Sequence, residues 1–99
     1  MVTRVSARQQ RLLREFGMNI QRWRKLNNVT ATDLAQRAFV SRKTLREIEA
    51  GTGTSQMASV MAVLGALGIA DTVVTAADPY NSEIGRIRMD AIVKAGGDV

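Results

Sequence analysis

A chain of 99 residues with 45% apolar side chains can form one small domain with a core, which a second subunit would further stabilise. Because it contains neither Cys nor His, the sequence excludes disulfides, thiolate or imidazole metal sites and the usual catalytic bases, so we expect no metal, no cofactor and no enzymatic activity. Residues 1–46 hold 11 Lys or Arg and 2 acidic residues, whereas residues 47–99 hold 3 Lys or Arg and 7 acidic residues. The net charge of +5 is therefore the sum of a basic first half and an acidic second half. The basic half indicates either a phosphate-binding surface or merely a soluble one.

The first predicted helix runs from about Ala7 to Leu26, and Ser6 with Gln9 has the spacing of a capping box. Gly17 inside this helix costs ~1 kcal/mol relative to Ala, which indicates that another backbone packs closely there. The apolar side chains recur every three or four residues and are expected to face inward: Leu12, Leu13, Phe16, Ile20, Trp23 and Leu26. The cations lie off that stripe and are expected to form a largely solvated face: Arg8, Arg11, Arg14, Arg22 and Lys25.

The pattern of residues 29–51 predicts two short helices joined by a tight turn. Thr30 or Thr32 can cap the first helix, whose inward residues are Leu34, Ala35 and Ala38. The small Ala35 allows the two helices to cross closely. Such a pair of helices is typical of a DNA-reading unit.

The second helix of this pair follows the turn at Phe39 and Val40. Ser41 provides its N-cap and Gly51 ends it. Leu45 and Ile48 form its buried stripe, which leaves the charged side chains facing outward: Arg42, Lys43, Arg46 and Glu47.

The segment after Gly51 is predicted to be a loop, residues 52–56, whose N–H groups and hydroxyls suit a phosphate. A helix follows from about Gln56 to Leu67, and Gly68 ends it. Its inward residues are Met57, Val60, Val63, Leu64 and Leu67. A short fifth helix over residues 70–77 carries Val73, Val74 and Ala77, and Asp78-Pro79 ends it.

The last predicted helix spans about Glu83 to Lys94, with Asn81 or Ser82 as its cap. One face carries the apolar side chains Ile84, Ile87, Ala91 and Ile92. A five-helix domain does not need this face for its own core. The face therefore either folds back on its own domain or meets a second chain, as a dimer element or as the binding surface for a partner.

The stretch from Phe16 to Ile69 resembles the phage-repressor and Cro-type helix-turn-helix family, often called the XRE family. The resemblance is carried by Thr30, Leu34-Ala35, Val40-Ser41, Leu45, Ile48-Glu49, Gly51 and Leu67-Gly68. Two positions depart from the family: Ala31 stands where Gln is common, which removes a usual phosphate contact, and Phe39 stands where Gly is common. The stretch from Leu67 to Gly85 resembles, more weakly, HipB-like antitoxins that repress their own operon and hold a kinase toxin.

The resemblance implies roles for individual residues. Arg24 matches an arginine that pairs with the glutamate closing the second helix of the pair, here Glu49, and this pair is expected to clasp the helices together. Base contacts are expected from Arg42, Lys43 and Glu47, and Arg46 is expected to reach either base or phosphate. The uncharged candidates for phosphate contacts are Thr30, Thr44, Thr52 and Thr54.

The sequence thus predicts an all-α, lambda-repressor-like five-helix domain over residues 6–78 and a C-terminal helical extension over residues 79–99. Its expected partners are double-stranded DNA and a second copy of the chain. Its expected function is that of a DNA-binding transcriptional regulator, most simply an autoregulating repressor. The alternative is an antitoxin-type module that neutralises a toxin and binds DNA secondarily. The longest apolar run, Met57 to Ala70, is too short to span a bilayer and no secretory signal is evident, so a cytoplasmic, nucleoid-associated protein is expected.

Overall fold

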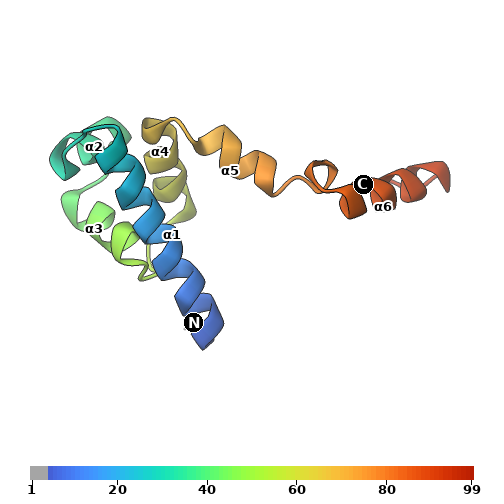
Figure 1. The fold of residues 1–99 in the computed structure, drawn as a ribbon, viewed down its shortest axis with the longest axis horizontal. Coiled ribbons are helices and arrows are strands. Elements are labelled where there is room, and N and C mark those ends of the chain that lie inside the picture. The colour runs from blue at the N-terminus through green and yellow to red at the C-terminus, as the bar shows by residue number, and fades with distance from the viewer. Residues whose placement is uncertain (1–4) are drawn as a thin grey trace. The chain divides into compact units, whose positions relative to one another are not determined.

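The computed structural model describes residues 5–99, and every regular element in this range is helical (Figure 1). The elements are α1 (Ala7–Leu26), α2 (Ala31–Ala38), α3 (Arg42–Ala50), α4 (Met57–Leu67), α5 (Ala70–Ala76), the 3-10 turn η1 (Pro79–Asn81) and α6 (Glu83–Lys94). The all-α prediction is therefore confirmed. Within this range no single helix is long and apolar enough to cross a membrane, although α4 and α5 reach that length and composition together.

The chain divides into two compact units. The first ends at Ile69 and contains α1 to α4, and the second runs from Ala70 to Val99 with α5, η1 and α6. The sequence placed α5 in the core domain, but α5 contains no buried residue. A seven-residue helix with only two large apolar side chains, Val73 and Val74, has little apolar surface to bury. The boundary therefore precedes α5 and does not lie after Asp78.

Helices α1, α2, α3 and α6 begin where short polar side chains cap them. The Ser6 hydroxyl accepts a hydrogen bond from the Gln9 N–H at 3.1 Å, and the Ser6 N–H donates to the Gln9 side chain at 3.0 Å, which is the predicted capping box. Ser41 caps α3 as predicted. Of the two alternatives at each of the other starts, Thr30 caps α2 and Ser82 caps α6.

The core of the first unit comes from α1 to α4. Its buried apolar side chains are Ile20, Leu34, Ala35, Ala38, Leu45, Ile48, Val63, Leu64 and Leu67. All of the inward residues predicted for α2 and α3 are among them. None of these core residues lies beyond Leu67, so the first unit closes its core without the C-terminal segment.

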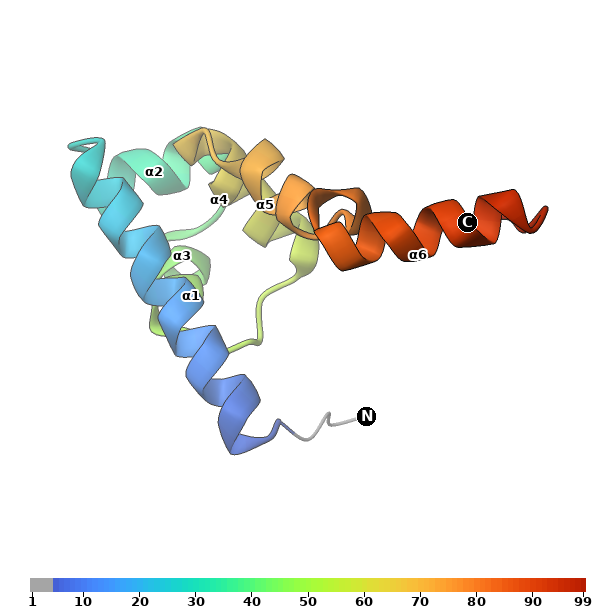
Figure 2. The same cartoon turned by 45° about the vertical axis from the view of Figure 1, so that its right-hand side comes forward.

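Several side chains predicted to face inward are exposed. On α1 these are Leu12, Trp23 and Leu26, of which Leu26 is 74% exposed, and on α4 Met57 is 70% exposed. Only Gly17 and Ile20 are buried on α1, and its first turns extend past α3 (Figure 2). Periodicity identifies the apolar face of a helix, but the length over which neighbouring helices cover that face depends on their packing.

The backbones of α1 and α3 approach closely at two glycines. A Cβ atom placed on Gly17 would lie 2.5 Å from the Glu49 carbonyl oxygen. A Cβ atom on Gly51, which ends α3 in a left-handed conformation with φ of 72°, would lie 2.5 Å from the Arg14 Cα atom. Both separations are too short for a side chain, so these glycines set the distance between the helices. The close approach expected at Gly17 is confirmed.

We predict that Gly17→Ala destabilises the protein by ~1 to 3 kcal/mol, because the new methyl group would force α1 and α3 apart. Gly65→Ala is the matched control, since Gly65 is also within a helix but has no atom within 4 Å of an added Cβ. That control should be neutral or stabilising by up to ~1 kcal/mol through its greater helix propensity. Urea unfolding followed by circular dichroism measures both. Equal stability of the two variants would contradict the close packing.

Phe39 ends α2 in a left-handed conformation, with φ of 55°, and its side chain is 95% exposed. This conformation costs a non-glycine residue ~1 to 2 kcal/mol, and an exposed ring recovers none of that energy by packing. We predict that Phe39→Gly stabilises the protein by ~0.5 to 1 kcal/mol. Phe39→Ala removes the ring but keeps the strain, so its stability should stay close to wild type. Thermal unfolding of both variants distinguishes relief of strain from removal of an exposed aromatic.

Candidate nucleic-acid interface

Helix α3 presents a charged surface on the side opposite its buried residues. Leu45 and Ile48 are buried, whereas Lys43 and Arg46 are exposed and Glu47 is half-buried. With 3.6 residues per turn, Lys43, Arg46 and Glu47 share the outward face of α3. The structure therefore brings these three predicted residues together on one helix surface.

Arg42 lies at the flank of this surface, where the guanidinium Nη1 atom donates a hydrogen bond to the Thr32 hydroxyl of α2. Arg42 is exposed like Lys43, and its guanidinium reaches toward α2. Sequence reasoning treated Thr32 only as an alternative cap and missed this contact. No signal in the sequence identifies it, because the contact depends on how α2 crosses α3.

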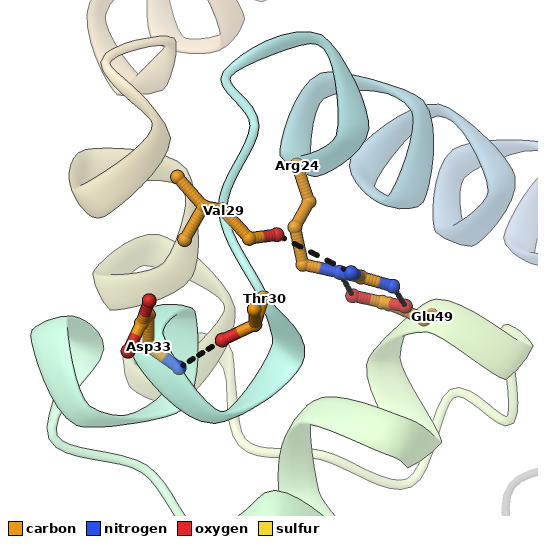
Figure 3. A network of polar contacts seen from close by, with 5 residues as sticks. All are labelled: Arg24, Val29, Thr30, Asp33 and Glu49. Carbon is orange, nitrogen blue, oxygen red and sulfur yellow. Dashed lines mark hydrogen bonds and ion pairs between the residues drawn. The ribbon is translucent and has the colours of Figure 1, made fainter.

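Arg24 and Glu49 form the predicted pair (Figure 3). Arg24 donates from Nε to Glu49 Oε2 at 2.8 Å and from Nη2 to Oε1 at 3.1 Å, and its Nη1 donates to the Val29 carbonyl at 3.4 Å. The two side chains are only 14% and 11% exposed, and the hydrogen bond to Glu49 raises the pKa of Arg24 above its ordinary value. This two-pronged contact joins the end of α1, the start of α2 and the end of α3.

A cleft of about 190 Å³ opens beside this pair. It is lined by Arg24, Ala31, Arg42, Leu45, Arg46 and Glu49. Because Arg24 occupies both oxygens of the only lining carboxylate, Arg42 and Arg46 leave the cleft with an excess of positive charge. The small side chain of Ala31 leaves this wall open. Such an arrangement suits an anionic oxygen group.

The threonines predicted to contact phosphate differ in the availability of their hydroxyl groups. Thr30 is exposed and accepts from the Asp33 N–H, so its hydroxyl proton remains available for a phosphate oxygen. Thr44 is half-buried, and its hydroxyl oxygen accepts from the Ser41 hydroxyl at 3.0 Å. Both can donate to a phosphate without losing these bonds.

Thr52 and Thr54 are bonded within their own loop. Thr52 donates its hydroxyl proton to the Glu47 carbonyl at 3.2 Å, and the Thr52 and Thr54 hydroxyls lie 2.8 Å apart. If Thr52 donates to Glu47, Thr54 is the donor between the two hydroxyls, so both protons are already used. A phosphate contact by either side chain would require a change of hydrogen-bond partner.

The predicted dimer or partner face lies on α6. Ile84 and Ile87 are 61% and 62% exposed, and Ala91 and Ile92 are exposed as well. The start of α6 is held by η1, because the Gly85 N–H bonds to the Ser82 hydroxyl and an added Cβ on Gly85 would collide with the Pro79 carbonyl. Within its own unit α6 therefore has a defined start and an uncovered apolar face.

Comparison with known proteins gives no match for this chain among family models, curated proteins or solved structures. The candidate site is therefore characterised by its own geometry. In residues 5–99 no three acidic side chains lie close enough to hold a metal ion. The side chains exposed around α3 are mainly cationic hydrogen-bond donors, Arg42, Lys43 and Arg46, with the carboxylate of Glu47 beside them.

Proposed function

We propose that this protein is a sequence-specific DNA-binding regulator in which α2 and α3 form a helix-turn-helix of the lambda-repressor-like kind. The observation that carries this proposal is the orientation of α3. Its apolar side is buried in the first unit, and Lys43, Arg46 and Glu47 point away from that core. A helix held in this way can enter the major groove of DNA with its charged face toward the base edges.

Arg42 is proposed to recognise guanine. A guanidinium can donate two hydrogen bonds to the O6 and N7 atoms of guanine, and the bond to Thr32 uses only one of the five N–H groups. Lys43 and Glu47 are proposed to contact neighbouring bases, and Arg46 a base or a phosphate. The Arg24–Glu49 pair supports this role because it fixes the end of α3 relative to α1.

The proposed assembly is a homodimer on an inverted-repeat operator, with the apolar face of α6 buried between the two copies. Exposed isoleucines of this number are unfavourable in an isolated chain, and a two-fold axis would bury both copies of the same face. A regulator of this kind acts most simply by repressing its own gene.

A second candidate function is that of an antitoxin whose α6 binds a partner protein. The observation that favours it is the breadth of the apolar surface of α6, because Val93 is exposed as well as Ile84, Ile87 and Ile92. These residues surround much more of the helix than one contact face requires. A reading frame for a kinase-like toxin beside this gene, and binding of its product to α6, would favour this function over simple self-association.

The proposed function predicts that Arg42→Ala weakens binding to the selected operator by ~1 to 3 kcal/mol and abolishes the preference for guanine at one position of each half-site. Operators selected from random DNA with the wild-type protein supply the probe, and fluorescence anisotropy gives the affinities. Arg37→Ala is the control, since Arg37 is an exposed cation in the last turn of α2, outside the cleft and the α3 surface. Wild-type affinity and unchanged selectivity in Arg42→Ala would show that this residue does not read a base.

A further inference from the structure

We propose that the outer face of α1, formed by Arg8, Arg11, Arg14, Arg22 and Lys25, is a second, sequence-independent binding surface for the phosphate backbone of nucleic acid. We call these five residues the α1 cationic face. All five side chains are exposed. The surface is separate from the α3 residues proposed to read bases and adds a function to them.

The five cations share one side of a single straight element. With 3.6 residues per turn Arg8, Arg11, Arg22 and Lys25 cluster on the side of α1 roughly opposite Gly17 and Ile20, the only residues that α1 buries. Arg14 lies at the edge of this side, where its backbone adjoins Gly51. Because Gly17 packs against the α3 backbone, the four side chains opposite it point away from α3, and Arg14 borders the end of α3. From Arg8 to Lys25 it extends about 26 Å along the helix axis.

The charges of this face are not neutralised within the described part of the chain. The one ion pair among residues 5–99 joins Arg24 to Glu49, and Arg24 is not part of the face. Arg22 bonds only to the neutral Asn19 side chain, at 2.8 Å. Glu15 is the single acidic residue of α1 and makes no ion pair with any of residues 5–99. The face therefore presents a net charge of about +4 to an external partner.

The chemistry of the face favours nucleic acid over other polyanions. Four of its five cations are arginines, whose planar guanidinium groups match phosphate oxygens, and duplex DNA carries one charge per about 1.7 Å of axis along the whole length of the face. A membrane surface would require α1 to insert a continuous apolar side. That side is packed within the first unit at Gly17 and Ile20, and the apolar side chains that α1 leaves exposed, Leu12, Met18, Trp23 and Leu26, are scattered singly over its 20 residues.

The test compares two triple variants that each remove three positive charges. Arg8→Gln/Arg11→Gln/Arg22→Gln alters the α1 cationic face, and Arg86→Gln/Arg88→Gln/Lys94→Gln is the matched control on α6, with its oligomeric state checked by sedimentation. Binding to a random-sequence duplex is measured as a function of salt. In the α1 variant we expect a slope of log K against log salt that is smaller by about 2.7, and binding at about 50 mM salt that is weaker by about 10- to 100-fold. Affinity for the operator, which is proposed to bind through α3, should change much less, so the operator-to-random affinity ratio should rise.

A third variant, Arg8→Lys/Arg11→Lys/Arg22→Lys, restores the positive charge without the planar guanidinium groups. It should recover the salt slope and most of the affinity for the random duplex. A wild-type slope in the α1 Gln variant, or an equal loss in the α6 control, would overturn the proposal. A different polyanion could also be the partner. The proposal would be overturned if wild-type protein bound polyglutamate, or vesicles with 30% phosphatidylserine, and the α1 Gln variant lost that binding while it kept its affinity for DNA. The random-duplex measurements do not depend on the reading of bases by α3. That proposed function is tested separately by the effect of Arg42→Ala on the preference for the operator.

Because four of the five side chains of the α1 cationic face point away from α3, one protein molecule can hold two DNA segments. Wild-type protein bound to a bead-tethered operator should therefore retain a second, fluorescent random duplex at low salt. The α1 Gln variant should stay bound to the operator but release the second duplex. Equal retention by the two proteins would show that the second segment is held elsewhere.

Discussion

Raising the salt concentration from about 50 to 200 mM is expected to weaken binding to the operator by ~10³- to 10⁵-fold. Each protomer offers the exposed side chains of Arg42, Lys43 and Arg46 near the proposed groove, and a dimer doubles them. Together with the other cations of residues 1–46, two such surfaces should neutralise roughly 6 to 10 phosphates and release the counterions bound to them. This is the largest effect that we expect for the proposed function.

Titration of labelled operator at four or more salt concentrations measures this dependence, with a random duplex of equal length as the reference. The random duplex should show a similar slope, because phosphate contacts carry no sequence information, and its affinity should be lower at every salt concentration. A flat response over this range would contradict an electrostatic interface. It would also leave the separation of charge between residues 1–46 and 47–99 without a function.

The local chemistry of the helix ends could be predicted from the sequence because it depends on residues close together in the chain. Ser6 and Gln9 meet within one helical turn, and Ser41 and Gly51 delimit α3 as expected. The inward residues of α2 were equally predictable, since Leu34, Ala35 and Ala38 lie on one side of a short helix. For an element of about two turns such as α2, the two neighbouring helices α3 and α4 cover the whole apolar face.

Burial of side chains on the longer helix α1 could not be predicted in the same way. The apolar stripe of α1 continues to Leu26, but α3 covers only the part around Gly17 and Ile20. Burial of a side chain requires a neighbour at that height along the helix, and its position is set by long-range packing. For the same reason the sequence counted α5 among the core helices, although the first unit closes its core at Leu67.

The candidate site was predictable in its residue types and less so in its contacts. The Arg24–Glu49 pair spans 25 residues, and it was anticipated from a family resemblance and not from spacing. The bond from Arg42 to Thr32 and the cleft beside Ala31 depend on how α2 crosses α3. A crossing angle cannot be read from periodicity, so the bond from Arg42 to Thr32 could not be predicted.

Removing the residues after Pro79 is expected to abolish dimerisation while folding is retained. All buried residues of the first unit lie between Gly17 and Leu67, so a chain ending at Pro79 keeps the entire core. It loses the exposed apolar face of α6, whose burial we propose as the dimer contact. In the dimer the two α3 helices would lie about one DNA turn, ~34 Å, apart, so each half-site strengthens binding at the other.

Sedimentation of the two chains and urea unfolding of the truncated one test this expectation. The truncated chain should be monomeric, should unfold cooperatively, and should bind an inverted repeat ~10²- to 10⁴-fold more weakly, close to its affinity for a single half-site. Full-length protein that stays monomeric at tens of micromolar would disprove a dimer through α6 and would favour a partner protein on that face. A truncated chain that no longer unfolds cooperatively would instead place α6 in the core, because loss of a dimer contact alone leaves the packing around Leu34, Leu45 and Leu64 intact.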